Sequence, residues 1–202
     1  MAYSKYKSLL QFEEKYGIKQ QKIDLFSDAI QHVVVGERLL FDLQEAEDFY
    51  AMQSEKAKSE FIITPILKEL QRKNLTKFRL FSGAALNVTK DLSGICDYIL
   101  SQNTEAIEVT APIFCLVEAK NRTVEEGFAQ CAAEMYAARI FNEKYKKTMP
   151  YIYGCVTTGQ EWAFLQLKDN QILIDKNRYF ISNIPLLLGV LQKVVDSFWE
   201  NK

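Results

Sequence analysis

The chain is poor in the residues that build several common kinds of site. Its 202 residues include one histidine, His32, and no Cys-x-x-Cys pair. A zinc site and a Ser-His-Asp or Cys-His catalytic centre are therefore not expected. The cysteines all lie among apolar residues, which predicts buried, reduced thiols. They are Cys96, Cys115, Cys131 and Cys155.

Glycine, proline and long apolar runs are also scarce. With 8 glycines and 4 prolines, the chain has no low-complexity segment and no glycine-rich phosphate loop. No run reaches the length of a membrane span, and the first residues lack the apolar core of a signal peptide. The composition, 48% hydrophobic and 25% charged, is that of a globular protein. We expect a cytoplasmic protein without a membrane partner.

The charge balance limits the kind of nucleic-acid partner. The net charge is −1, whereas proteins that coat nucleic acid without sequence preference are usually basic. An enzyme that touches nucleic acid through a local patch is still compatible with this balance. Two basic groups could form such a patch, although both could equally be solvated helix ends. They are Lys144, Lys146 and Lys147, and Arg72, Lys73, Lys77 and Arg79.

The chain divides into two parts by pattern. Residues 1–53 read as a helical extension packed on the core, and residues 54–202 as the core domain with a C-terminal hairpin and helix. In the extension we expect helices over 3–16 and 38–50, with Gly17 ending the first and a short extended run at Val33–Val35. A strong helix follows over 54–73, with Pro65 as a point of bending or restart.

The core continues with a regular order of elements. Thr123–Glu126 matches a capping box at the start of a helix that runs to Lys144. The full order is helix, three meandering strands, helix and strand, which predicts an α/β fold with a mixed sheet flanked by helices. The expected strands are 77–86, 94–101, 113–119 and 151–157, followed by a hairpin of 162–167 with 172–175 and a helix over 184–199.

Charged residues occur at the ends of two of these apolar strands. Asp97 lies near the start of 94–101, and Glu118 and Lys120 lie near the end of 113–119. In an antiparallel pair these ends are adjacent, and Glu118 and Lys120, two apart, share a face. Two acids and one base leave a net negative site that favours a hard divalent cation. The alternative is a salt bridge in which Lys120 neutralises Asp97 or Glu118.

The stretch from Gly94 to Asp97, followed by Val117-Glu118-Ala119-Lys120, resembles the PD-(D/E)XK nuclease superfamily, which has the restriction-endonuclease-like fold. The resemblance covers about residues 54–167 and includes the order of elements. Glu60 resembles the acid on the family's first core helix, with Glu55 as a competitor. Gln130 resembles the glutamine that many members carry after the Glu-x-Lys strand.

This resemblance implies a metal-dependent nuclease acting on nucleic acid, expected to be DNA. Asp97 and Glu118 would bind Mg²⁺, for which Mn²⁺ can substitute, with Glu60 assisting. Lys120 would position or activate the attacking water, and Gln130 would orient Lys120 or the phosphate. A homodimer is compatible with this activity.

Several features leave alternatives open. Cys96 replaces the proline of the family name, and position 134 is Glu where RecB-like members carry tyrosine, which argues against a RecB-type exonuclease. Glu60 could simply favour the helix dipole, and Gln130 could face solvent. The alternative function is an inactive nucleic-acid-binding or regulatory module that keeps the fold.

Overall fold

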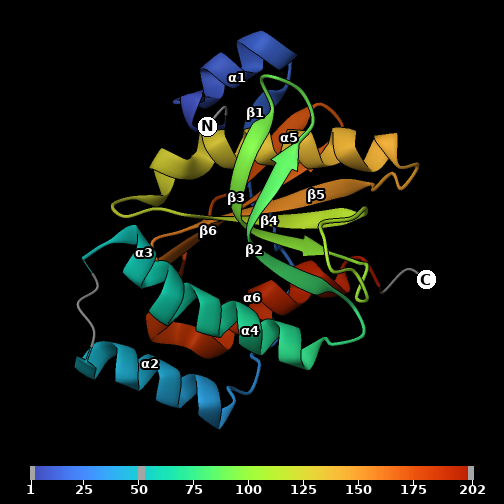
Figure 1. The fold of residues 1–202 in the computed structure, drawn as a ribbon. Helices are drawn as coiled ribbons and strands as arrows, with labels where there is room; N and C mark the ends of the chain where they lie inside the picture. The colour runs from blue at the N-terminus through green and yellow to red at the C-terminus, as the bar shows by residue number, and fades with distance from the viewer. Residues whose placement is uncertain (1–2, 50–52, 200–202) are drawn as a thin grey trace.

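A computed structural model describes residues 3–49 and 53–199. A mixed eight-stranded sheet forms its centre, with strand order β1-β7-β6-β5-β4-β3-β2, and β8 pairs with β6 (Figure 1). Strands β4 and β5 are parallel, as are β1 and β7, and the other pairs are antiparallel. The strands are β1 Lys19–Ile23, β2 Arg79–Asn87, β3 Ser93–Ser101, β4 Ile113–Ala119, β5 Tyr151–Thr157, β6 Glu161–Lys168, β7 Gln171–Asp175 and β8 Tyr179–Phe180.

Helices cover both faces of this sheet. Helices α1 and α5 lie on one face, and α2, α4 and α6 lie on the other (Figure 1). The α-helices are α1 Leu9–Tyr16, α2 Glu37–Phe49, α3 Glu55–Lys58, α4 Thr64–Lys73, α5 Phe128–Lys144 and α6 Ile184–Asp196. Shorter helical turns are η1 Tyr3–Lys5, η2 Ser59–Ile63, η3 Val124–Gly127 and η4 Ile181–Asn183.

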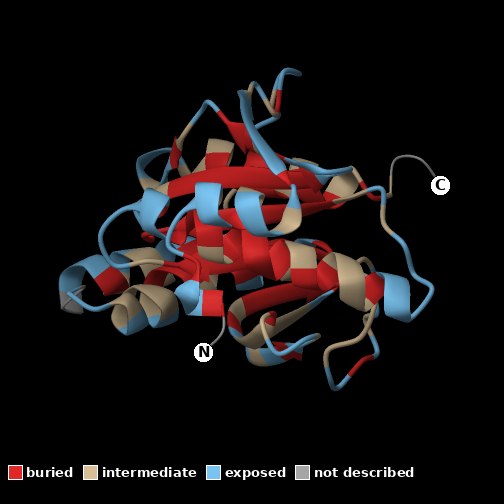
Figure 2. Cartoon of the chain, turned by 90° about the horizontal axis from the view of Figure 1, so that it is seen from above, coloured by how far each residue is buried: buried red, intermediate tan, exposed pale blue. Residues whose placement is uncertain are grey.

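Each face of the sheet has its own apolar core. On the α4 and α6 side, Phe114 packs with Phe78 and Phe198. On the α5 side, Leu116 packs among the small residues of α5. Every residue of β4 is buried, and Figure 2 shows the buried residues concentrated in the sheet and on the helix faces that cover it. A charged side chain on β4 is therefore placed in the interior of the protein.

The expected fold class and core order are confirmed. The chain has a mixed sheet flanked by helices, in an arrangement consistent with a restriction-endonuclease-like core. The expected strands 113–119 and 151–157 match β4 and β5, and Gly17 ends α1 with φ of 68°. Pro65 lies in the first turn of α4, after the π-type turn η2 in which Thr64 N–H reaches Ser59 O. The wider turn accommodates a residue without an N–H, so the helix restarts here.

Five local predictions were wrong. Residues 3–16 form a short 3-10 turn and then a helix from Leu9, and Val33–Val35 is not a strand. Strand β1 lies between the two helices expected in the 1–53 extension, which was expected to be helical, and it pairs with β7. The Thr123 side chain makes no capping hydrogen bond, and the 3-10 turn η3 precedes α5. Helix α6 ends at Asp196 rather than at Trp199.

Two expectations concern residues next to the gap at 50–52 in the described ranges. Tyr50, the expected end of the 38–50 helix, is outside the described residues, and the division at residues 53 and 54 stays a prediction. Within 3–49 and 53–199, no helix combines the length and apolar character required to cross a bilayer.

Candidate active site

The site is built at the point where the middle of β3 meets the end of β4. The two strands pair antiparallel, with Tyr98 opposite Val117. The Ala119 N–H donates to Asp97 Oδ2 at 2.8 Å, which fixes the Asp97 carboxylate against the end of β4. The predicted meeting of Asp97 with the Glu118 end of β4 is confirmed.

A glycine lies across from Asp97 on the other neighbouring strand. Gly83 falls between the pairs Ser82–Tyr98 and Ala84–Cys96, and therefore faces Asp97. Its φ of 62° is in the left-handed region that favours glycine. The position of β2 beside Asp97 therefore carries no side chain.

Glu118 and Lys120 share one face of β4, as their spacing predicts. Lys120 Nζ forms an ion pair with Glu118 Oε1. The Glu118 side chain is 2% exposed and that of Lys120 is 15% exposed. The Lys120 backbone N–H donates to Thr157 O at 2.8 Å, so the residue is anchored to the end of β5. This contact is the salt bridge that the sequence left open, but it neutralises only one of the acids.

Helix α5 completes the arrangement with an amide and a second buried acid. Gln130 Oε1 accepts from Lys120 Nζ at 3.3 Å, and Gln130 Nε2 donates to Glu134 Oε1 at 3.1 Å. Gln130 is therefore not a solvent-facing residue. The Glu134 side chain is fully buried. We call Asp97, Glu118, Lys120, Gln130 and Glu134 the strand-end cluster.

A glycine lets α5 approach the cluster closely. A Cβ atom at Gly127 would lie 3.1 Å from Lys120 Cγ and 2.5 Å from Val156 Cγ1. The absent side chain thus leaves room for the aliphatic stem of Lys120 between β5 and α5. Sequence analysis did not identify Gly127 as a residue that shapes the site.

The structure places Glu55, rather than Glu60, next to the cluster. Glu60 is on η2, has a side chain that is 52% exposed and lies 3.7 Å from Lys56 Nζ. Glu55 opens α3 and interacts electrostatically with Lys120 and Asp97. Lys58 Nζ donates to Asn121 O at 2.6 Å, which attaches α3 to the turn after β4.

Burial and mutual repulsion dominate the electrostatics of the acids. Burial, followed by the charge of Asp97, raises the pKa of Glu118 to about 7 despite the opposing effect of Lys120. Burial also raises the pKa values of Asp97 and Glu55. Burial and the charge of Glu118 raise the pKa of Glu134. Burial works to lower the pKa of Lys120, but Glu118 outweighs it and the pKa is raised.

Two carboxylate oxygens in the cluster receive no hydrogen bond from an amide, ammonium or hydroxyl group among the described residues, although the Glu118 and Glu134 carboxyls interact with each other. They are Glu118 Oε2 and Glu134 Oε2, and both are buried. Buried polar atoms are nearly always satisfied, so these two require an explanation. An oxygen that lacks a donor, within a cluster of three acids and one lysine, is suited to a cation.

The donor set fits magnesium better than a softer metal. Magnesium usually takes one or two carboxylates and keeps waters and phosphate oxygens as its other ligands. Asp97 and Glu118 can supply the two carboxylates. Within the described ranges, no three acidic, histidine or cysteine side chains form a complete metal cage. Binding of Mg²⁺ by Asp97 and Glu118 therefore stays a prediction.

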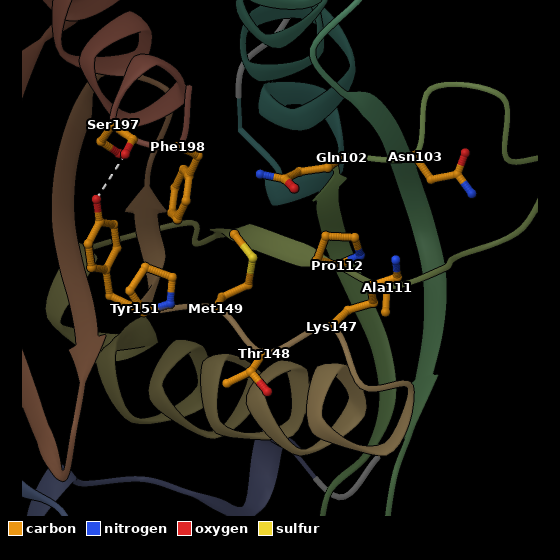
Figure 3. Close-up of a pocket in the computed structure, with 11 residues that line it drawn as sticks. Gln102, Asn103, Ala111, Pro112, Lys147, Thr148, Met149, Tyr151, Ser197 and Phe198 are labelled. Atoms are coloured by element: carbon orange, nitrogen blue, oxygen red, sulfur yellow. Dashed lines mark hydrogen bonds between the residues drawn. The ribbon is translucent and has the colours of Figure 1, made fainter. Parts of the chain in front are cut away.

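A cavity lies at the end of β4 opposite the strand-end cluster. This cavity of about 780 Å³ lies beside Pro112, before β4, and Tyr151, at the start of β5 (Figure 3). Phe198 forms part of its wall, and Tyr151 donates to Ser197 O at 3.0 Å. Seven strand residues separate its edge from Lys120, or roughly 20 Å at the rise of a strand. It is thus separate from the strand-end cluster.

Comparison with known proteins gave limited similarity. No protein-family model and no curated protein matches the chain. A solved chain titled as the cryo-EM structure of a DrdV–DNA complex matches with a TM-score of 0.48 and 9% identity. The match covers 79% of the present chain and 13% of that chain. Similarity at this level does not establish an activity, so the chemistry of the chain has to be inferred from its own residues.

Proposed function

We propose that the protein is a metal-dependent nuclease that hydrolyses phosphodiester bonds of nucleic acid, most simply DNA. The observation that carries this proposal is the strand-end cluster. It holds an excess of buried acid against one lysine, where β3 meets the end of its antiparallel partner β4. This composition suits a divalent cation next to a phosphate.

Each side chain then has a defined task. Asp97 and Glu118 would hold Mg²⁺, with Mn²⁺ as a substitute, and Glu55 is better placed than Glu60 to assist them. When bound, the ion would supply positive charge to the phosphate and lower the pKa of water beside it. Lys120 would hold the attacking water and stabilise charge that develops on the phosphate oxygens. Gln130 would keep the Lys120 ammonium directed toward this position.

A cleavage screen tests the proposal. Wild type and the variants Lys120→Ala and Lys15→Ala are incubated with single- and double-stranded DNA and RNA in Mn²⁺. Lys15 pairs with Asp91 at 2.6 Å on the surface and is the matched lysine control. Loss of a transition-state donor should lower the rate at least about 100-fold in Lys120→Ala, with no loss in Lys15→Ala. Full activity in folded Lys120→Ala would refute the proposed role of the lysine.

One observation favours a second candidate, an inactive binding or regulatory module. The Lys120 ammonium is closed in an ion pair with Glu118. If it stays closed, the chain would bind nucleic acid without cleaving it. Thermal protection by DNA with no products in Mn²⁺ would identify this outcome.

The expected homodimer stays a prediction. Cleavage of both strands of a duplex by one active site per chain is most direct when two copies act together. Light scattering after size exclusion should then give twice the mass of one chain, either alone or with duplex DNA. A single-chain mass in both samples would contradict it.

A further inference from the structure

Glu134 needs an explanation that the proposed function does not supply. It is fully buried on α5 and lies among small and apolar neighbours. A carboxylate is costly to bury, and a leucine or alanine would fill this helix position without that cost. A buried acid in such a place indicates that its oxygens have a specific task.

The contacts of Glu134 form a chain that ends at Lys120. Glu134 Oε1 accepts from Gln130 Nε2 at 3.1 Å. A side-chain amide has a donor end and an acceptor end, so this contact determines which end faces away from Glu134. The acceptor end, Gln130 Oε1, is then the one that faces Lys120 Nζ, at 3.3 Å.

The reversed amide would disturb the cluster. If Gln130 turned over, its NH₂ group would face the Lys120 ammonium, and two donors would oppose each other. Gln130 alone has no preference between the two orientations on steric grounds, because its oxygen and nitrogen ends have nearly the same shape. The Lys120 ammonium favours the observed orientation from one end of the amide, and the Glu134 acceptor fixes it from the other end.

We propose that Glu134 is a positioning residue: it fixes the orientation of the Gln130 amide, and through it the place of the Lys120 ammonium between Glu118 and Gln130. This role deepens the proposed nuclease function, on which it depends for its biological meaning. The geometry makes Glu134 a third member of a relay of contacts from helix α5 to the strand end. It assigns no direct contact with substrate to Glu134.

The test measures how firmly Lys120 is held, without metal or substrate. The probe is acetylation by an N-hydroxysuccinimide ester, followed residue by residue with mass spectrometry. Lys77 is the internal reference, since its Nζ lies 2.6 Å from Asp196 and its side chain is 31% exposed, away from the cluster. A global change in the fold would alter both lysines, whereas loss of positioning would alter Lys120 alone.

Four variants distinguish an acceptor from a charge or a volume. Glu134→Leu removes the acceptor and should raise Lys120 acetylation about tenfold, as expected for loss of one hydrogen bond to a charged group. Glu134→Gln keeps an acceptor oxygen and should label at the wild-type rate. Gln130→Met breaks the relay at its middle and should match Glu134→Leu. Adding Glu134→Leu to Gln130→Met should then give no further increase.

The proposal is overturned if Gln130→Met leaves Lys120 labelling unchanged. It is also overturned if the effects of Glu134→Leu and Gln130→Met on Lys120 labelling are additive in the double variant. An increase in Glu134→Gln equal to that in Glu134→Leu also overturns it, because the charge rather than the acceptor would then matter. If Glu134→Leu fails to fold, the labelling of Lys120 in Gln130→Met and Glu134→Gln still tests the proposal. Absence of cleavage in the nuclease screen would refute the proposed function and leave this labelling result intact, so the two failures are distinguishable.

Discussion

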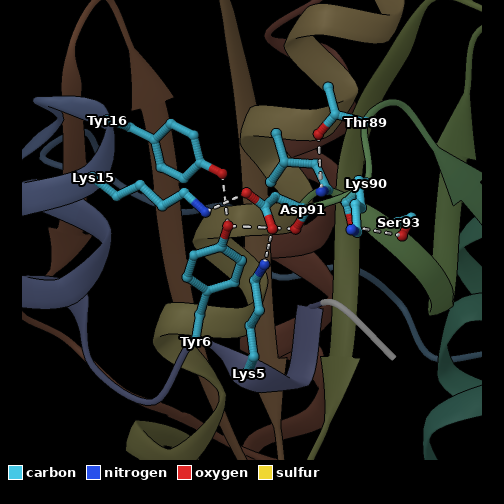
Figure 4. A network of polar contacts seen from close by, with 9 residues as sticks. Lys5, Tyr6, Lys15, Tyr16, Thr89, Lys90, Asp91 and Ser93 are labelled. Atoms are coloured by element: carbon cyan, nitrogen blue, oxygen red, sulfur yellow. Dashed lines mark hydrogen bonds and ion pairs between the residues drawn. The ribbon is translucent and has the colours of Figure 1, made fainter.

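The protein contains two clusters of lysine and carboxylate that differ in burial and in their ratio of acid to base. The surface cluster consists of Lys5, Lys15 and Asp91, with Tyr6 and Tyr16 beside them (Figure 4). It joins η1 and α1 to the turn between β2 and β3. The strand-end cluster joins β3, β4 and α5 in the interior.

The two clusters differ in the ratio of acid to base. On the surface, two lysines surround one aspartate, whose side chain is 50% exposed. Hydrogen bonds from Lys15 and then Lys5 lower the pKa of Asp91 to about 2. At the strand end, three acids share one lysine, and burial raises the pKa of Glu118 to about 7.

This difference separates a cluster that stabilises structure from one that is incomplete. In the surface cluster both lysines pair with Asp91, and all three side chains reach solvent. In the strand-end cluster, Glu118 Oε2 and Glu134 Oε2 receive no hydrogen bond from an amide, ammonium or hydroxyl group among the described residues. Buried acids are destabilising in their charged form unless a proton or a cation neutralises them, and this is the physical reason for placing the proposed metal site there.

The largest expected contrast is in cleavage. Glu118→Gln removes one charged oxygen ligand and should lower the cleavage rate at least about 100-fold. Asp91→Asn, which also neutralises one acid, should leave the rate unchanged. Steady-state cleavage assays in Mn²⁺ measure both. Equal losses in the two variants would erase the distinction between the clusters.

The next contrast is in how stability depends on pH. Glu118 holds its proton more tightly when folded, so the folded protein binds more protons than the unfolded chain between the ordinary glutamate pKa of 4.5 and about 7. The free energy of unfolding should therefore fall as pH rises through this window, by about 1 to 3 kcal/mol. Urea unfolding at several pH values checks this, and Glu118→Gln should flatten the curve. A metal-free wild type that gains stability over the same window would contradict the raised pKa.

The tight packing around Lys120 gives a third test. In Gly127→Ala, the new Cβ would lie 2.5 Å from Val156 Cγ1 and 3.1 Å from Lys120 Cγ. Overpacking should cost about 1 to 3 kcal/mol of stability and displace the lysine. Urea unfolding together with the cleavage assay measures both effects. Wild-type values in both would show that the glycine is not needed for the close approach.

The smallest expected effect concerns the surface cluster itself. Asp91→Asn removes two exposed ion pairs, which contribute little in water. The thermal midpoint should fall slightly at low salt, and the difference should vanish near 1 M salt, where charges are screened within about 3 Å. Scanning calorimetry at two salt concentrations measures this. A large drop that persists at high salt would mean that the cluster acts through packing rather than charge.

The sequence predicted the centre of the fold better than its edges. Strand β4 was clear because Ile113–Val117 is an uninterrupted apolar run, and its pairing with β3 brought Asp97 to Glu118. Strand β1, with the sequence Lys-Gln-Gln-Lys-Ile, is almost entirely exposed and has no apolar alternation, so local pattern could not indicate it. Its position depends on the parallel pairing with β7, which only the folded chain provides.

The site was predicted in part for the same reason. Because Glu118 and Lys120 are two residues apart, the sequence predicted that they share one face of the strand. Their ion pair in the structure agrees with this prediction. Glu134 was not assigned a role, although it is the lone acid in a stretch of alanine, cysteine and methionine that would otherwise read as a buried face. Glu55 and Glu60 could not be separated by sequence, because the π-type turn η2 alters which side of the helix each residue occupies.

The most direct test of the central claim is a calorimetric titration of Mn²⁺ into wild type, Asp97→Asn and Asp91→Asn, with and without an uncleavable oligonucleotide. The strand-end cluster should bind the ion in wild type and in Asp91→Asn, and binding should be lost in Asp97→Asn. Equal binding by wild type and Asp97→Asn would place the ion elsewhere. No binding by folded wild type, even with the oligonucleotide present, would leave the cluster as a salt bridge and contradict the proposed nuclease.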